Sequence, residues 1–239
     1  MTVSMRLGFL IPPGNPVIEG ELFRLAPPGV SVHFHRMTAS GNTGSHEGQE
    51  ERNRSQIAHL DGGVALLALV KPAVIVLAHT ASSYTLGKDG EAQLVERLTK
   101  ASGIPFVTAF GSVLQALAHL GAKRVALGTP YSTEATLKAK AFLEANGVEV
   151  PSWGNLDNVK NIYEETPARA EALARKVDAP TAQAVFLSGV GMPTIEVLGR
   201  LEHSLGKPAV SSTQALMWNA LRVAGSRARI EGFGKLLSN

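Results

Sequence analysis

Several segments of the chain occur twice in similar form. Residues 73–82 read AVIVLAHTAS and residues 184–193 read AVFLSGVGMP. The segment 6–15, RLGFLIPPGN, is likewise similar to the segment 124–133, RVALGTPYST. A chain built from two similar halves usually binds its ligand where the halves face each other. Equivalent loops of the two halves are therefore candidates for opposite walls of one site.

Short apolar runs alternate with longer amphipathic segments along the whole chain. The runs are rich in Val, Ile and Leu without polar alternation, as expected for parallel strands buried on both faces. This order predicts an α/β fold of two pseudo-symmetric, doubly wound, Rossmann-like domains, with right-handed crossovers and the active-site cleft between the domains. The predicted strands are Arg6–Ile11, Val30–His35, Val74–Ala78, Phe106–Thr108, Arg124–Gly128, Ala184–Ser188 and Ala209–Val210. The predicted helices are Glu50–Val70, Gly90–Ser102, Ser112–Leu120, Thr133–Asn146, Pro167–Val177, Ile195–Leu205 and Thr213–Ala224.

The repeat also predicts how the chain divides into domains. Residues 1–107 together with residues 211–239 are expected to form a first, discontinuous α/β domain, and residues 108–210 a second one. No Pro/Ser-rich linker marks a boundary, so we expect the two domains to pack closely. The stretch 38–50, TASGNTGSHEGQE, is polar and rich in Gly, and is either a flap over the cleft or an ordinary surface loop.

Composition excludes several classes of function. The 239 residues include no cysteine, which excludes disulfides, cysteine-bound zinc and thiolate catalysis. The net charge is +3 and the basic residues are scattered, so clusters such as Arg52 and Arg54 are interpreted as solvated surface rather than a nucleic-acid site. No apolar run approaches the ~20 residues that span a bilayer, and the N-terminal segment resembles a strand more than a signal peptide. We expect a cytoplasmic protein without nucleic-acid or membrane partners. A monomer and a homo-oligomer are both compatible with the sequence.

Four loops follow predicted strands at the sheet edge where α/β proteins bind ligands. They are Pro12–Asn15, His79–Ser83, Thr129–Ser132 and Gly189–Thr194, and a fifth loop, Ser211–Thr213, lies at the domain crossover. They are rich in Gly, Ser and Thr and contain no Asp, Glu, Lys or Arg, so hydroxyls and backbone N–H groups could hold a carboxylate without a cation. The alternative interpretation is that these residues only cap helices.

His79 is the one strongly titratable side chain in these loops, and it can hold or give a proton near neutral pH. A buried histidine that satisfies a neighbouring carbonyl is the alternative. His33, His35 and His46 have no acidic partner at a suitable spacing, so no metal site is expected. The G-x-G at 189–191 is weak evidence for a nucleotide.

Five segments together resemble one known superfamily. They are LIPPGN (10–15), VIVLAHTASSYTLG (74–87), GIPFVTAFGSVLQALAHLGAKRVALGTPY (103–131), AVFLSGVGMPTIEVLGRLEHSLGKPAVSS (184–212) and QALMWNALRVAG (214–225). The segments resemble the Asp/Glu racemase superfamily, and within it the maleate isomerase and arylmalonate decarboxylase branch. The resemblance covers nearly the full length. It implies cofactor-free carbon-acid chemistry on a small carboxylate or dicarboxylate, in a cleft between two pseudo-symmetric domains.

The resemblance also implies which residues form the site. Racemases and maleate isomerases of this superfamily place one cysteine in each of two opposed loops, and the corresponding positions here are His79 and Gly189. The chain therefore lacks both family cysteines. The residues expected to bind the substrate carboxylate are Pro13, Gly14, Asn15, Thr80, Ala81, Tyr131, Val190, Ser211 and Ser212.

This departure from the family pattern selects among reactions. A two-base racemase needs an acid or base on both faces of the substrate, which Gly189 cannot supply, and the family's maleate isomerisation uses a thiolate. Decarboxylation needs a dioxyanion hole and one proton donor. The sequence therefore favours a decarboxylase-like lyase with His79 as the donor. A single-base isomerase or tautomerase, a hydrolase in which His79 activates water, and a non-catalytic carboxylate-binding relative are the alternatives.

Overall fold

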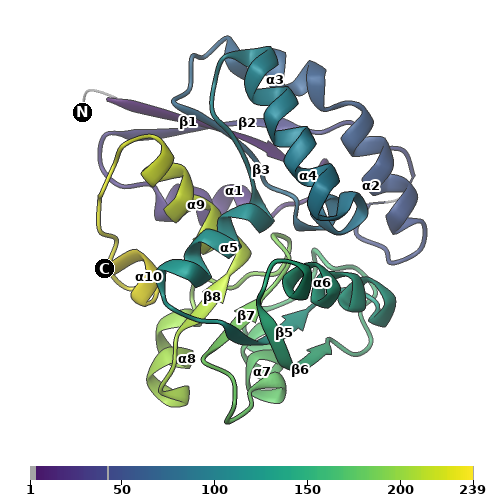
Figure 1. Ribbon diagram of the computed structural model, residues 1–239, viewed down its shortest axis with the longest axis vertical. Coiled ribbons are helices and arrows are strands. Elements are labelled where there is room, and N and C mark those ends of the chain that lie inside the picture. The colour runs from purple at the N-terminus through teal and green to yellow at the C-terminus, as the bar shows by residue number, and fades with distance from the viewer. Residues whose placement is uncertain (1–3, 42, 239) are drawn as a thin grey trace.

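Two four-stranded parallel sheets form the framework of the protein, which is described by a computed structural model over residues 4–41 and 43–238 (Figure 1). The sheets have equivalent strand orders, β2-β1-β3-β4 and β6-β5-β7-β8, which confirms the predicted α/β class and the internal repeat. The strands are β1 (Met5–Ile11), β2 (Val30–Arg36), β3 (Val74–Leu77), β4 (Phe106–Thr108), β5 (Arg124–Thr129), β6 (Glu149–Asn155), β7 (Ala184–Leu187) and β8 (Ala209–Ser211).

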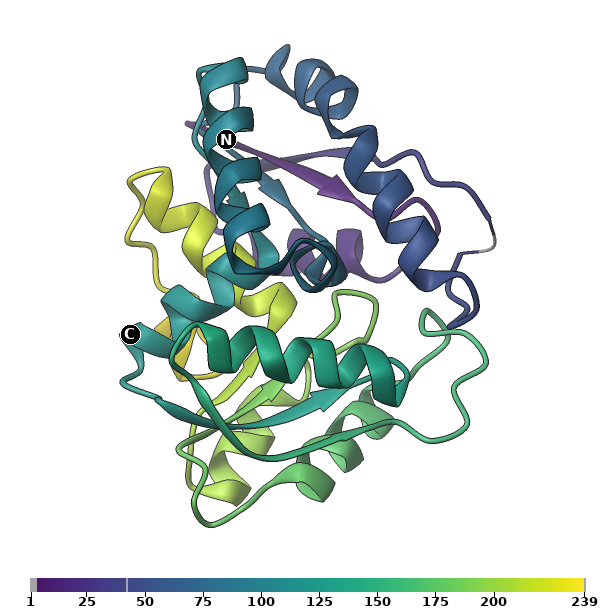
Figure 2. The same cartoon turned by 45° about the vertical axis from the view of Figure 1, so that its right-hand side comes forward.

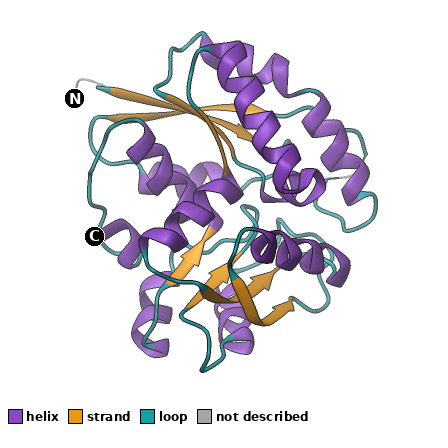
Figure 3. Ribbon diagram, viewed as in Figure 1, coloured by secondary structure: helices purple, strands orange, loops and turns teal. Residues whose placement is uncertain are grey.

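Helices cover both faces of each sheet, and one layer of helices lies between the sheets (Figures 2 and 3). The first sheet packs on α3 and α4, the second on α7 and α8, and α1, α5, α6 and α9 contribute to a core that both sheets share. The helices are α1 (Ile18–Leu25), α2 (Gln49–Ala58), α3 (Leu60–Ala68), α4 (Thr80–Ser102), α5 (Ala109–His119), α6 (Thr133–Ala145), α7 (Pro167–Val177), α8 (Leu198–Leu205), α9 (Ser212–Val223) and α10 (Lys235–Ser238).

The shared core joins the two halves into one body. Alternate residues of β1, Leu7 and Phe9, face this core, and Phe186 of β7 enters it from the other sheet. Phe110 of α5 stacks edge-on against Phe186, with ring centroids 5.8 Å apart. Burying aromatic rings of this size contributes about 1.5–3 kcal/mol each. This continuous apolar layer fixes the positions of the loops of one half relative to those of the other.

The repeat places two of the predicted site residues in equivalent positions. β3 and β7 are the third strands of their sheets and end at Leu77 and Leu187. His79 and Gly189 each lie two residues beyond these strand ends. The carboxyl ends of parallel strands carry the ligand-binding loops in this class of fold. The topology therefore gives the two residues matching places in the two halves.

Two predicted helices differ from the structure, and three elements were not predicted: α1, β6 and α10. The predicted helix Glu50–Val70 is two helices that meet at His59, whose backbone (φ −106°, ψ 10°) is not helical. The predicted helix Gly90–Ser102 begins earlier, at Thr80, and is kinked at Gly87, where φ is +69°. The prediction omitted β6, a half-exposed strand containing Pro151 and Gly154, two residue types that weaken a strand pattern.

No helix in the described part of the chain combines the length and the apolar character that crossing a bilayer requires.

Candidate active site

The five predicted loops meet in the centre of the molecule. The hydroxyl of Thr80, in the first half, lies 3.2 Å from the phenol oxygen of Tyr131 in the second. The Tyr84 hydroxyl is hydrogen-bonded to Ser188. The Ser212 hydroxyl accepts a hydrogen bond from the backbone N–H of Gly189 at 3.1 Å. These buried contacts join the strand ends of the two sheets around one point.

A small cavity lies at this meeting point. Its volume is about 30 Å³, close to the space of one water molecule in the liquid. Both halves of the chain contribute to its wall. The lining residues are Pro12, Thr43, Gly44, Ser45, Gln49, Arg52, Asn53, Gln56, His79, Tyr131, Ile162, Tyr163, Val190 and Gly191.

His79 enters this cavity from the N-terminal end of α4. The residue is 8% exposed, and its Nδ1 atom lies 2.8 Å from the Ser82 hydroxyl one turn into the helix. The Nε2 atom has no hydrogen-bond partner among the described residues. Burial, and then the positive charge of Arg52, lower the pKa of His79 from 6.5 to about 4. The imidazole is therefore neutral at neutral pH.

Because folding lowers the pKa of His79, its contribution makes the protein less stable in acid. Between pH 6.5 and 4 the unfolded chain binds a proton that the folded chain resists, so the free energy of unfolding falls as the pH falls. The expected loss from this group is about 3 kcal/mol on going from pH 7 to pH 4. Urea unfolding gives the free energy of unfolding of the wild type and of His79→Asn at each pH. We expect the wild type to lose about 3 kcal/mol more than the variant between pH 7 and pH 4. A difference that stays constant with pH would contradict the buried, neutral assignment.

Gly189 has a backbone conformation that few other residues adopt. Its φ is +110°, and a Cβ atom there would lie 3.0 Å from the ring of Pro130 and 3.2 Å from the Tyr131 hydroxyl. A cysteine at this position would therefore be strained. The loop is built around glycine, so the position equivalent to His79 carries no side chain that can transfer a proton.

The predicted carboxylate-binding residues divide into two groups in the structure. Tyr131 and Val190 line the cavity, and Thr80 contacts Tyr131. Burial raises the pKa of Tyr131 to about 12, so its phenol stays protonated and can donate a hydrogen bond. The backbone N–H groups of Val190 and Gly191 have no acceptor among the described residues. These groups form the part of the predicted anion site that the structure brings together.

The other residues predicted to bind the carboxylate make hydrogen bonds or packing contacts within the protein. The Asn15 side chain donates to the carbonyl of Val190 at 3.0 Å and accepts from the N–H groups of Val17 and Ile18. The Pro13 carbonyl accepts a hydrogen bond from Arg36.

The remaining members of this group are also engaged in packing or capping. Gly14 packs so closely on Thr43 that a Cβ atom would lie 2.2 Å from the threonine hydroxyl. Ser211 caps α9 by accepting from the N–H of Gln214, and Ala81 lies in the wall of a neighbouring pocket. None of these residues lines the small cavity, and a direct carboxylate contact from them stays a prediction.

The cavity wall also contains residues from α2 and from two polar loops that the sequence did not predict. Arg52 was interpreted as solvated surface, but it is 7% exposed and lies in the cavity wall. Tyr163 reaches the cavity from the segment between β6 and α7, and Ile162 donates from its N–H to the carbonyl of Gly44 at 2.9 Å. The stretch 38–50, described except for residue 42, therefore lies against the second half of the molecule at the cleft.

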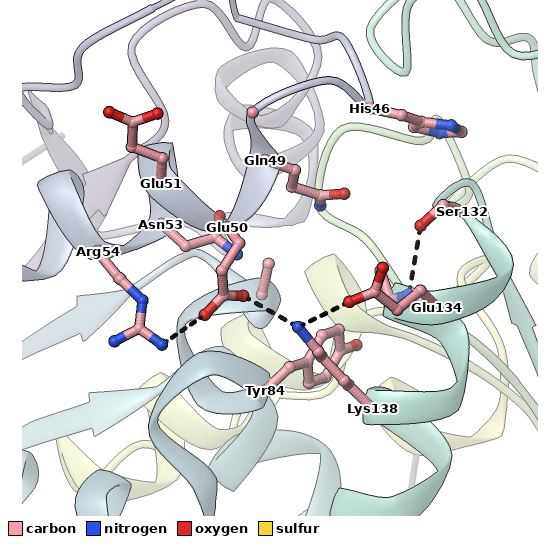
Figure 4. A pocket seen from close by; sticks show the side chains of 13 residues that line it. His46, Gln49, Glu50, Glu51, Asn53, Arg54, Tyr84, Ser132, Glu134 and Lys138 are labelled. Carbon is pink, nitrogen blue, oxygen red and sulfur yellow. Dashed lines mark hydrogen bonds and ion pairs between the residues drawn. The ribbon is translucent and has the colours of Figure 1, made fainter.

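A larger pocket of about 520 Å³ adjoins the cavity and shares Gln49 and Asn53 with it (Figure 4). Lys138 of α6 lies between Glu50 of α2 and Glu134, 3.4 and 3.3 Å from their carboxylate oxygens. The lysine therefore joins the two halves across the pocket. Ala81 and Tyr84 also line it. In the described part of the chain, no group of three or more His, Asp or Glu side chains is arranged to hold a metal ion.

Comparison with known proteins agrees with this architecture. The model of the arylmalonate decarboxylase family matches residues 7–237. The arylmalonate decarboxylase of Bordetella bronchiseptica is 29% identical over 239 residues, which cover 96% of this chain and 95% of that protein. A cysteine-to-serine variant of the Nocardia farcinica maleate cis-trans isomerase, solved with a covalently bound succinylcysteine intermediate, superposes with a TM-score of 0.88 at 26% identity, covering 98% of each chain.

The structure of unliganded arylmalonate decarboxylase superposes with a TM-score of 0.80 at 25% identity, covering 98% of this chain and 99% of that one. Sequence identity therefore does not separate the two reactions. The family match extends over almost the whole chain. The protein belongs to the arylmalonate decarboxylase family.

Proposed function

We propose that the protein is a cofactor-independent decarboxylase of a small malonate-like dicarboxylate, and that His79 gives the proton to carbon. One observation carries the proposal. His79 lies buried in a cavity formed by both halves of the molecule, and the equivalent position in the other half is a glycine. Of the two positions related by the repeat, only the one occupied by His79 can therefore supply a proton.

The anion-binding groups support the same reaction. Tyr131, Val190 and Gly191 line the same cavity as His79, and the Thr80 hydroxyl contacts the Tyr131 phenol. Donors held in place before the reaction stabilise the charge that develops on a carboxylate as its neighbouring bond breaks. The N-terminus of α4, which begins at Thr80, adds a favourable dipole.

The proposed step conserves atoms and charge. The bond between the central carbon and the leaving carboxylate breaks, carbon dioxide departs, and the electron pair enters an enediolate on the remaining carboxylate. The N–H bond of protonated His79 then breaks and a C–H bond forms at the same carbon. The substrate dianion and one proton become a monocarboxylate and carbon dioxide, and His79 takes its next proton from solvent.

Charge in the site explains how a histidine with a low pKa can act as an acid. Burial and the charge of Arg52 disfavour a second cation at His79. A bound dianion reverses this, because an opposite charge within a few ångströms raises the pKa of an imidazole. In protonated His79 both ring nitrogens carry a proton, so Nδ1–H can donate to the Ser82 hydroxyl and the Nε2 proton is the one transferred to carbon. The substrate thus promotes the protonation of its own donor.

Admission of substrate requires the cleft to open. A cavity of about 30 Å³ is smaller than any dicarboxylate, and its wall includes Ser45 and Tyr163, which come from different halves. Separation of the segments that carry them would enlarge the cavity. Their closure afterwards would exclude water from the enediolate.

The absence of cysteine argues against a covalent route. The Nocardia farcinica isomerase was solved with a succinylcysteine intermediate. This chain contains no cysteine and has Gly189 at the position that corresponds to the second family cysteine, so no such adduct can form. Decarboxylation needs no covalent intermediate.

A second candidate is a non-covalent isomerase that uses His79 as its single base. The overall shape favours it, because the TM-score is 0.88 against the maleate isomerase and 0.80 against the decarboxylase. The two candidates differ in whether a carboxylate is lost.

A screen of substituted malonates, maleate and amino dicarboxylates in deuterated water, followed by NMR, tests the proposal. We expect at least one malonate to lose a carboxylate and gain one deuterium at carbon. Conversion of maleate to fumarate without carbon dioxide release would support the isomerase instead. Absence of turnover and of deuterium exchange with every compound would contradict both enzymatic candidates.

A further inference from the structure

Arg52 is a buried cation that no carboxylate neutralises in the described part of the chain. The residue is 7% exposed and forms no ion pair, whereas its helix neighbour Arg54 is exposed and pairs with Glu50. The guanidinium donates to the backbone carbonyls of Ser45 and Glu47. Carbonyls satisfy hydrogen bonds but do not cancel a charge, and an uncompensated buried charge is unfavourable.

The position of Arg52 connects this charge to the candidate active site. Arg52 lines the same cavity as His79 and Val190, and its positive charge contributes to the lowered pKa of His79. The planar guanidinium has five N–H donors, of which two are used by the carbonyls. The other three have no hydrogen-bond acceptor among the described residues, and a guanidinium can bind a carboxylate through a pair of such N–H groups.

We propose that Arg52 is the cationic receptor for the carboxylate that stays on the substrate. The site would then combine one arginine with the neutral donors of the strand-end loops. Contact with the remaining carboxylate places the cation where negative charge increases during decarboxylation. Contact with the departing carboxylate would instead stabilise the reactant and oppose the loss of carbon dioxide. The inference rests on the proposed function for the choice between the two carboxylates.

Equilibrium binding tests this role without any turnover. Propionate represents the remaining carboxylate, and propionamide has nearly the same shape without the charge. NMR titration should show that the wild type prefers propionate. Arg52→Gln should weaken propionate binding roughly 10- to 100-fold, the usual worth of a hydrogen bond to a charged group, and should leave propionamide binding unchanged.

Two matched variants separate this role from a structural one. Arg54→Gln removes a charge from the same helix at an exposed position and should change neither affinity. Arg52→Lys keeps the charge without the fork and should fall between the wild type and Arg52→Gln. Thermal unfolding of each variant reports any loss of the Ser45–Glu47 contacts.

The result that overturns the proposal is unchanged propionate affinity in Arg52→Gln, or no preference for propionate in the wild type. Equal weakening of propionate and propionamide would also overturn it, because that outcome assigns Arg52 to loop structure alone. These results do not depend on carbon dioxide release. Failure of the decarboxylation screen therefore remains distinguishable from failure of the carboxylate receptor.

Discussion

The His79→Asn variant is expected to lose about 10²- to 10⁴-fold in kcat, which is the usual contribution of a positioned general acid or base. Asparagine can keep a hydrogen bond to Ser82 but cannot transfer a proton. The side chain lies in a loop at a strand end and faces a cavity, so the fold should persist. Steady-state kinetics on the substrate identified by the NMR screen give the loss in kcat.

His33 provides the matched control. It is also a histidine hydrogen-bonded to a serine, with its Nε2 atom 2.9 Å from the Ser31 hydroxyl, but it lies on β2 and does not line the cavity. His33→Asn should retain kcat within a factor of about 2–3, since it removes no group near the reacting atoms. Full activity in His79→Asn would remove His79 from the mechanism, and an equal loss in both variants would assign the effect to folding.

Tyr131→Phe is expected to lower kcat by about 10²- to 10³-fold, the typical effect of removing one oxyanion-hole donor. Its phenol is 3% exposed, lies 3.2 Å from the Thr80 hydroxyl, and stays protonated because burial raises its pKa to about 12. A neutral, fixed donor can stabilise the enediolate oxygens without itself losing a proton. Turnover of the identified substrate by the variant and the wild type, compared at saturation, gives the effect on kcat.

Tyr84→Phe is the control for this substitution. Tyr84 is also buried and its hydroxyl is also hydrogen-bonded, to Ser188, but the residue lines the adjoining pocket rather than the cavity. Each variant loses about one hydrogen bond of stability, roughly 1 kcal/mol. We expect Tyr84→Phe to retain kcat within about tenfold. If Tyr131→Phe retains the same activity as Tyr84→Phe, Tyr131 does not act on the developing charge.

The framework could be predicted because it depends on buried, repetitive features. Continuous apolar runs such as Val74–Leu77 and Ala184–Leu187 are completely buried strands, and their similar surroundings made the repeat visible. The same repeat placed His79 and Gly189 in equivalent loops. β6 was missed because only part of it is buried, so its composition carries little of the pattern on which strand prediction depends.

The residues that enter the cavity from outside the repeat could not be predicted in the same way. α2 has a highly polar sequence, QEERNRSQIA, without an apolar stripe, so nothing in its pattern distinguishes buried Arg52 from exposed Arg54. Tyr163 lies in an irregular loop whose path depends on its contact with Gly44 and Gly191 in three dimensions. The left-handed backbone of Gly189 is likewise a tertiary feature.

The central claim is that one residue, His79, protonates the substrate carbon from one face. The most direct measurement is the configuration of the product formed from a malonate with two different substituents on its central carbon, determined by chiral chromatography during the first turnovers. A single donor, with a glycine at the equivalent position of the other half, predicts one enantiomer in large excess, carrying one deuterium when the reaction is run in deuterated water. A racemic product from the first turnovers would contradict the one-donor site.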